Sequence, residues 1–171
     1  VALPETEQQL KGVLAICRQE RIPVVPRGAG TGLSGGARPS SDGVLLGFSK
    51  MDQILEVDLA NCAARVQPGV RNLAISEAVA EHGLYYAPDP SSQIACSIGG
   101  NVAENSGGVH CLKYGLTVNN ILGLKVLTLA GDELVIGGPG GDPECLDLLA
   151  LFCGSEGLLG VVTEVWVRLL P

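Results

Sequence analysis

The chain has 171 residues, of which 46% are apolar and 17% charged, and its 11 basic and 18 acidic residues give a net charge of −7. This length and composition allow one globular domain with a sizeable core. Lys and Arg are scattered rather than concentrated, which argues against a nucleic-acid-binding surface. The apolar run at 121–130 is broken by Lys125, so it is shorter than the roughly 20 residues of a membrane span. Residues 1–5 show no signal-peptide pattern.

The cysteines indicate a reducing environment. None of the spacings between them is C-x-x-C, and neither His82 nor His110 lies at zinc-finger distance from a pair. Several lie in apolar stretches, where a free thiol behaves as a small hydrophobe. We therefore expect reduced thiols in a cytoplasmic protein and predict no metal site. The six positions are 17, 62, 96, 111, 145 and 153.

The first half of the chain alternates short elements with turns. Thr6 and Gln9 form a capping-box pattern and predict a helix over 7–19. A short strand is expected at 22–26, followed by a glycine-rich loop over 27–39 and strands at 43–49, 54–58 and 63–67. An amphipathic helix over 71–81 should stop at Gly83.

The second half begins with a segment, 88–114, in which almost nothing is periodic. A long strand is expected at 121–129, and Gly131-Asp132 predicts a hairpin turn into a strand at 133–136. Asp142-Pro143 should begin a helix that reaches 152, and the chain closes with a strand at 161–170. Helices and strands are mixed without a regular βαβ rhythm, so the predicted fold class is α+β.

The first candidate binding segment is the glycine-rich loop after the first strand. It has five glycines between positions 28 and 36. Glycine permits positive-φ turns and close approach of the main chain, so backbone N–H groups can close around an anion. The alternative is a flexible surface loop. A Walker A motif is absent, and the G-x-G-x-x-G match at 30–35 is followed by a strand, where a dinucleotide-binding helix should begin. We therefore predict phosphate binding without a helix dipole behind the loop.

Two further segments have the same character. Residues 88–108 combine prolines, paired glycines and uncharged hydrogen-bonding side chains, which suits a polar heterocycle or pyrophosphate; the alternative is an Ω-loop filled by its own side chains. Residues 154–163 contain three glycines and Glu156, which could bind a ribose or adenine donor; alternatively, Gly154 is a helix C-cap. Together the three segments predict one large phosphate-bearing ligand. A hydrolytic triad is not indicated, because His82 and His110 lie at a helix end and in a loop.

These segments resemble a known family. Residues 23–36 are similar to the pyrophosphate loop of FAD-binding domains of the p-cresol methylhydroxylase/vanillyl-alcohol oxidase (PCMH) type, and residues 97–108, 113–117 and 154–163 resemble other segments of that domain. Within the family, the segments are most like those of the glycolate oxidase and D-lactate dehydrogenase group. The resemblance implies two α+β subdomains, at 1–58 and 59–171, with FAD between them.

The resemblance also implies cofactor contacts. FAD would be non-covalent, because Thr31 lies where some relatives attach FAD through a His, and Ser97 lies where the family usually has Thr. The implied cofactor-binding residues are Pro26, Arg27, Gly28, Ala29, Gly30, Thr31, Gly32, Leu33, Pro88, Ser97, Gly100, Asn101, Asn105, Ser106, Gly107, Glu156, Gly160 and Val161.

The implied activity is hydride transfer from a 2-hydroxyacid to FAD. In the family, a cap domain after the cofactor domain binds the substrate, so we predict no catalytic residue among these residues. An iron–sulfur subunit is the expected electron acceptor, with peripheral membrane attachment through partner subunits. Two alternatives stay open: a non-catalytic FAD-binding subunit of a multi-subunit oxidase, and an NADPH-linked flavin reductase similar to the UDP-N-acetylenolpyruvoylglucosamine reductase.

Overall fold

Two β-sheets organise the residues that the computed structural model describes, 1–138 and 146–171. The smaller sheet pairs β1 (Val24–Arg27) with β2 (Val44–Gly47) in parallel. The larger sheet is antiparallel, with the order β3-β4-β7-β5-β6. Its strands are β3 (Ile54–Asp58), β4 (Ala63–Val66), β5 (Ile121–Leu127), β6 (Glu133–Gly137) and β7 (Val161–Arg168).

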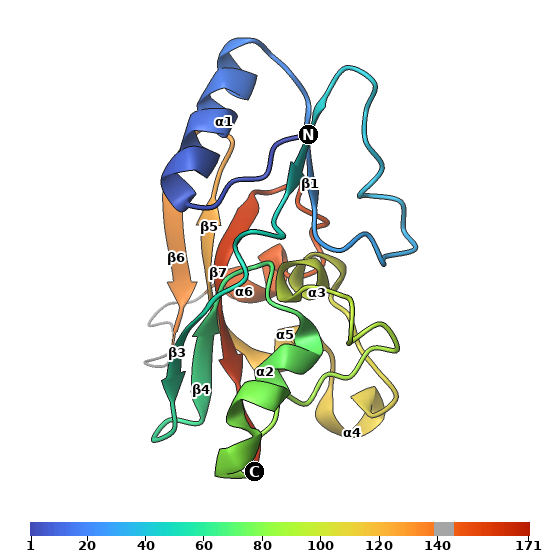
Figure 1. Cartoon of the computed structure of the whole chain (residues 1–171), viewed down its shortest axis with the longest axis vertical. Coiled ribbons are helices and arrows are strands. Elements are labelled where there is room, and N and C mark those ends of the chain that lie inside the picture. The colour runs from blue at the N-terminus through green and yellow to red at the C-terminus, as the bar shows by residue number, and fades with distance from the viewer. Residues whose placement is uncertain (139–145) are drawn as a thin grey trace.

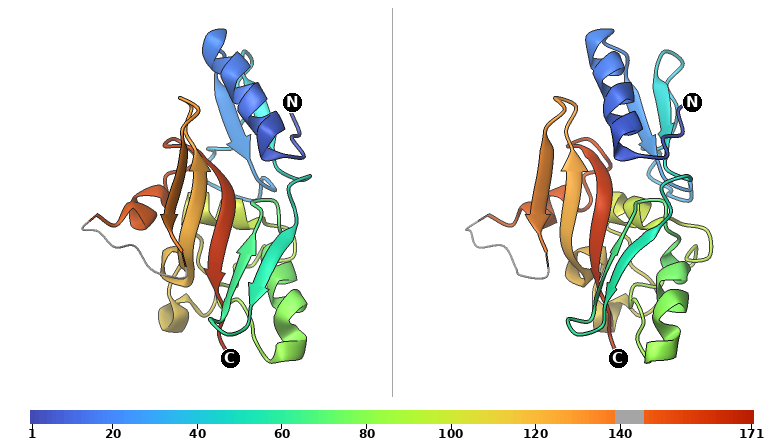
Figure 2. Two further views of the ribbon diagram at one scale, coloured as in Figure 1. Left: turned by 90° about the vertical axis from the view of Figure 1, so that its left-hand side faces the viewer. Right: turned by 60° about the vertical axis from the view of Figure 1, so that its left-hand side comes forward.

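The helices lie at one end and on one face of the larger sheet. Figure 1 shows α1 beside the small sheet at the N-terminal end, while α2 and α3 lie further down. Figure 2 shows α2 and α3 together on one side of the larger sheet. None of the described helices is long and apolar enough to cross a bilayer. The helices are α1 (Glu7–Gln19), α2 (Asn72–Val79) with a 3₁₀ turn (Ala80–His82), α3 (Ile98–Glu104), α4 (Cys111–Tyr114), α5 (Thr117–Asn120) and α6 (Leu148–Phe152).

Helix α1 forms as its sequence predicts, with one change at its cap. The Thr6 side chain accepts a hydrogen bond from the Gln9 N–H at 3.3 Å. The Gln9 side chain accepts from the Glu5 N–H rather than from that of Thr6, so the reciprocal half of the capping box is shifted by one residue. The helix buries Leu10 and Leu14.

The described residues have two separate clusters of buried side chains. The larger cluster lies between the five-stranded sheet and helices α2 and α3. In the smaller one, Leu10 and Leu14 of α1 pack with Leu46 of β2 and with Leu127 and Val161 of the larger sheet. The core therefore joins α1 and the small sheet to the ends of β5 and β7.

Strand pairing bears on the proposed division of the chain at residue 58. Strand β3 ends at Asp58 and pairs with β4 in the larger sheet, from Ile54 opposite Val66 to Asp58 opposite Ala63. Strand β3 therefore belongs to the same sheet as the strands that follow it in the chain, although the division places it with the residues before them. The two-subdomain division stays a proposal.

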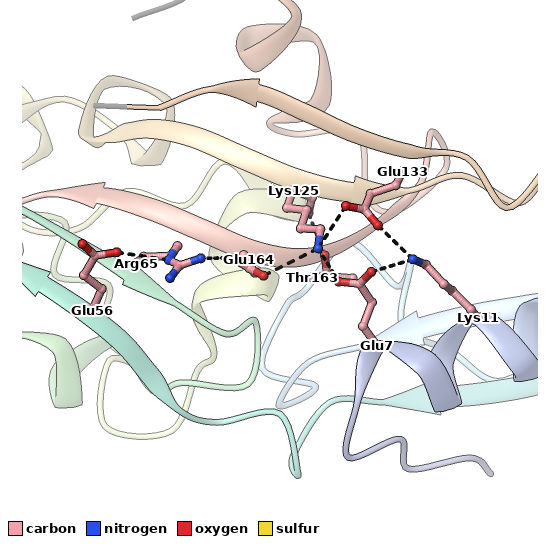
Figure 3. A network of polar contacts seen from close by, with 8 residues as sticks. All are labelled: Glu7, Lys11, Glu56, Arg65, Lys125, Glu133, Thr163 and Glu164. Atoms are coloured by element: carbon pink, nitrogen blue, oxygen red, sulfur yellow. Dashed lines mark hydrogen bonds and ion pairs between the residues drawn. The ribbon is translucent and has the colours of Figure 1, made fainter. Parts of the chain in front are cut away.

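A network of ion pairs on the larger sheet also holds α1 (Figure 3). Lys125 of β5 lies 2.7 Å from Glu7 of α1, 3.1 Å from Glu133 of β6 and 3.8 Å from Glu164 of β7. Lys11 contacts both Glu7 and Glu133 at 2.8 Å. The network continues from Glu164 to Arg65 and then to Glu56. It therefore connects the first helix to all five strands of the larger sheet.

Two of the predicted elements need correction. The segment 88–114 was predicted to be irregular, but it contains α3 and α4. Asp142 and Pro143, the expected start of the last helix, lie outside the described residues; the helix that is described begins after Asp147, whose side chain caps the Ala150 N–H at 2.9 Å. The other predicted strands and helices are present, with ends that differ by a few residues.

Candidate cofactor site

A cavity of about 450 Å³ lies between the glycine-rich loop after β1 and helix α3. A smaller cavity of about 60 Å³ shares Gly28, Ser97 and Glu156 with it and adds Gly160 and Val161. The three glycine-rich segments, which are far apart in the sequence, therefore meet at one place. The predicted residues that line the larger cavity are Pro26, Arg27, Gly28, Ala29, Gly30, Thr31, Gly32, Leu33, Ser97, Gly100, Asn101, Ser106 and Glu156.

The absence of side chains at two glycines shapes the loop. A Cβ atom on Gly28 would overlap the Ser97 hydroxyl at the start of α3. Gly30 has φ +73°, and a Cβ atom there would overlap the guanidinium group of Arg27. Glycine at both positions lets the loop approach α3 closely and lets Arg27 fold across the loop.

The sequence predicted that no helix N-terminus lies next to the loop, and the position of α3 shows that this prediction is wrong. The loop is indeed not followed by a helix along the chain, but α3 comes to it from a distant segment. Ser97 is the N-cap of α3, and its hydroxyl accepts from the Gly100 N–H at 3.4 Å. Since Gly28 lies against Ser97 and Gly100, the first turn of α3 faces the loop.

Four charged side chains line the larger cavity, namely Arg27, Arg38, Glu104 and Glu156. Within the described ranges, no ion pair joins any of them to one another or to another residue. The two guanidinium groups are therefore available to a phosphate, for which arginine is well suited.

Sequence reasoning missed Glu104 and Arg38. The Glu104 carboxylate accepts a hydrogen bond from the Ser34 hydroxyl at 2.6 Å and lies 3.0 Å from the point where a Cβ atom on Gly32 would be. Glu104 is the one charged residue in the segment 97–108, and that isolation was a signal that could have singled it out. Arg38 follows the glycine cluster directly and offered a similar signal.

Three predicted residues, Pro88, Asn105 and Gly107, do not line either cavity. The Pro88 carbonyl accepts from the buried Asn72 side chain at 3.1 Å. Asn105 ends α3 with φ 50°, and its side chain accepts from the Val118 N–H at 3.1 Å. A Cβ atom on Gly107 would lie 2.5 Å from Leu116. All three thus form contacts beside the site, and their predicted contacts with FAD stay a prediction.

Asn101 lines the cavity and also forms internal hydrogen bonds. Its side chain is buried, accepts from Asn72 at 3.0 Å and donates to Ser106 at 3.4 Å. The Cys153 thiol donates to the Asn105 side chain at 3.5 Å, and burial raises the pKa of this thiol to about 11, so it is protonated at neutral pH. Buried amide networks of this kind fix the shape of a site.

The third segment joins the loop to α3. Glu156 has φ 52°, which is unusual for a residue other than glycine. Its N–H donates to the Ala103 carbonyl at 2.9 Å, and its carboxylate lies 2.8 Å from the point where a Cβ atom on Gly36 would be. Strained backbone of this kind costs about 1–3 kcal/mol and is concentrated at functional sites.

A histidine–carboxylate pair lies outside the cavity. The His110 Nδ1 atom is 2.6 Å from Asp89, and the His110 backbone N–H also donates to the Asp89 carboxylate at 3.2 Å. Burial alone would raise the pKa of Asp89, but the hydrogen bonds from His110 outweigh burial and hold that pKa below its usual value. The pair ties together the two loops that carry the cavity residues Ser92 and Ser106.

This geometry defines a cofactor-binding domain. The glycine-rich loop, the two arginines without an ion pair in the described ranges and the meeting of three segments fit a nucleotide with a pyrophosphate group. Cβ atoms at Gly28, Gly30, Gly32 and Gly36 would meet side chains that line the same cavity, namely Ser97, Arg27, Glu104 and Glu156. The chain belongs to the FAD binding domain family, whose pattern matches residues 1–137. FAD is thus the cofactor, and the resemblance seen in the sequence is confirmed.

The chain is also similar to named proteins along its whole length. The chain is 64% identical over 171 residues to the glycolate oxidase subunit GlcD of Escherichia coli (strain K12), covering 100% of this chain and 34% of that protein. It is 48% identical over 172 residues to GlcD of Bacillus subtilis (100% and 37%) and 38% identical over 172 residues to D-lactate dehydrogenase of Archaeoglobus fulgidus (100% and 38%).

A structure of alkyldihydroxyacetonephosphate synthase superposes with a TM-score of 0.88 at 23% identity, over 99% of this chain and 31% of that one. This likeness supports the fold alone. The chain spans about a third of the length of the curated relatives named above.

Proposed function

We propose that this chain is the FAD-binding part of an oxidoreductase that oxidises a 2-hydroxyacid such as glycolate or D-lactate, with FAD held non-covalently. The observation that carries the proposal is the meeting of three glycine-rich segments at one cavity in a member of the FAD binding domain family. The hydroxyacid class follows from relatives that are a glycolate oxidase subunit and a D-lactate dehydrogenase.

Each segment has a proposed task in holding FAD. The loop from Pro26 to Leu33, with the Arg27 guanidinium above Gly30, would bind the pyrophosphate. Ser97, Gly100, Asn101 and Ser106 would contact the flavin or ribityl part, while Glu156, Gly160 and Val161 would contact the adenosine part. When bound, FAD supplies the hydride acceptor, and the protein orients it.

We assign two tasks to other parts of the protein, namely binding of the substrate carboxylate and removal of the proton from its hydroxyl. Oxidation of a 2-hydroxyacid needs cationic groups at its carboxylate and a base at its hydroxyl. The arginines that line the cavity, Arg27 and Arg38, are placed for phosphate, so we assign these substrate groups to the remaining polypeptide. We further propose that the electrons leave to an iron–sulfur subunit, in a cytoplasmic assembly attached peripherally to the membrane through its partners.

Cofactor release tests the proposal most directly. The full-length protein is purified and treated with acid, and the released cofactor is compared with FAD and FMN standards. We expect FAD, released without proteolysis. FMN, or no flavin even after reconstitution with FAD, would overturn the cofactor assignment.

A second measurement separates the activity from the alternatives. The FAD-loaded protein is mixed with glycolate, D-lactate or NADPH in the presence of a redox dye. We expect reduction with a hydroxyacid. Reduction with NADPH alone would indicate the flavin reductase, and no reduction with any of the three would indicate a non-catalytic FAD-binding subunit.

A further inference from the structure

Glu104 is a carboxylate inside a cavity built for an anion. It lines the cavity together with Arg27 and Arg38, yet neither arginine forms an ion pair with it within the described ranges. Opposite charges that share a cavity without neutralising one another fit a ligand that has an anionic part and a separate part rich in hydrogen-bond donors.

The Glu104 side chain is held in place. One carboxylate oxygen, Oε1, accepts from the Ser34 hydroxyl at 2.6 Å, and the same oxygen lies close to Gly32. In the part of the chain that the structure describes, this is the one side-chain hydrogen bond of the carboxylate. A carboxylate has about four acceptor positions, so most of those of Glu104, an exposed residue at the cavity, have no protein partner in the described ranges.

The chemistry of a carboxylate limits what it can contact. It only accepts hydrogen bonds, and it repels phosphate oxygens. Because FAD carries no cationic group, its part that contacts Glu104 would be an uncharged group with O–H or N–H donors. A ribose diol presents two adjacent hydroxyls, and a carboxylate that accepts from ribose hydroxyls is a recurrent solution in dinucleotide sites.

From these observations we propose that Glu104 binds the ribose hydroxyls of the adenosine half of FAD and thereby determines specificity at that part of the site. The inference rests on the proposed cofactor site. The adenosine half is favoured because Glu104 lies at the end of α3, next to Ala103, whose carbonyl accepts from Glu156 of the adenosine-side segment.

The test measures the dissociation constant of FAD from the full-length apoprotein by flavin fluorescence. Three cofactors are compared, namely FAD and two analogues whose adenosine ribose lacks the 2′- or the 3′-hydroxyl. The wild-type protein should bind at least one analogue about 10-fold more weakly than FAD, because hydrogen bonds to charged groups have that order of strength. Equal affinity for all three would overturn the proposal without affecting the proposed function, which requires only that FAD binds.

Glu104→Gln then assigns the effect to this side chain. Gln has the same shape and retains an acceptor for Ser34, so the fold should be kept, and the thermal unfolding of the apoprotein checks this. The variant should bind FAD about 10-fold more weakly and should no longer distinguish FAD from the analogue. Unchanged or tighter FAD binding, as expected if the carboxylate merely repels the pyrophosphate, would contradict the proposal.

Ser34→Ala is the matched control. It removes the one hydrogen bond that holds Glu104 but leaves the carboxylate in the cavity. This variant should still distinguish FAD from the deoxy analogue. If Ser34→Ala lost the discrimination in full while Glu104→Gln kept it, the preference would come from the loop conformation instead of the carboxylate, and the proposal would be wrong.

Discussion

The Lys125 ammonium group lies 2.7 Å from the Glu7 carboxylate and so joins the centre of the larger sheet to the first helix. Lys125 also contacts Glu133 and Glu164, and its side chain is only 18% exposed. Lys125 contacts three carboxylates in a mostly buried position, so it should contribute more to stability than one half of a single surface pair. Without it, the three acidic groups would face one another without their shared lysine.

The first prediction follows from that arrangement. Lys125→Met should lower the free energy of unfolding by about 1–2 kcal/mol, between the values typical of surface and buried pairs. The corresponding fall in melting temperature is about 2–8 °C. Lys50→Met is the matched control, since among the described residues Lys50 pairs with Glu5 alone and both side chains are about half exposed; its effect should be smaller. Equal effects of the two substitutions would show that the network adds nothing beyond an ordinary surface pair.

The second prediction concerns acid. Hydrogen bonds from Lys11 and Lys125 lower the pKa of Glu133 to about 2, from 4.5. A lowered carboxyl pKa stabilises the folded state above the unfolded pKa, and this stabilisation is lost as the pH falls from about 5 towards 2. The wild type should therefore be more stable than Glu133→Gln at pH 6, and the difference should shrink as the pH approaches 2. Denaturant unfolding of both proteins at several pH values measures it, and a difference independent of pH would contradict the argument.

Local sequence patterns predicted where most helices and strands lie, but they did not predict which strands pair. The helix over Glu7–Gln19 follows from its cap and its apolar spacing. Helix α3 was missed because Gly99 and Gly100 are poor helix formers. It forms because Ser97 caps its start, Ile98 and Val102 are fully buried, and Asn105 ends it in the left-handed conformation. Tertiary packing thus overrides propensity.

Pairing and side-chain partners over long distances could not be predicted from local patterns. Ala63 pairs with Arg168, and nothing near either residue indicates this register. In the same way, the dense glycines of the loop after β1 indicated a binding segment directly, whereas Glu104 gains its role from Ser34, 70 positions away in the sequence.

The third prediction tests the glycine cradle. Gly30→Val and Gly32→Val should each prevent FAD retention while leaving a folded protein, because the added side chain blocks the approach of the main chain to phosphate. At Gly30, with φ +73°, the side chain also displaces Arg27; at Gly32 it meets Glu104. The flavin absorbance per mole of purified protein measures the loss.

Gly131→Val is the control for backbone strain in that experiment. Gly131 has φ +94° and lies in the hairpin turn, with nothing within 4 Å of a new Cβ atom. The strain should be similar to that at Gly30, about 1–2 kcal/mol, but the flavin content should be normal. If the loop were a mere connector, all three variants would keep their flavin.

The last prediction is that residues 1–171, loaded with FAD, cannot oxidise a hydroxyacid on their own. His110 is the candidate base, since its Nδ1 is held by Asp89 and its ring is largely exposed. It does not line the cavity, however, and Lys113, the nearest basic side chain in sequence, donates to the Tyr114 hydroxyl. A positioned imidazole without cationic groups around the substrate carboxylate should give no useful rate.

Dye reduction with glycolate and D-lactate, measured for the FAD-loaded domain beside the full-length protein, tests this. Substrate-dependent reduction by the domain, lost on His110→Ala, would show that the catalytic centre lies within these residues.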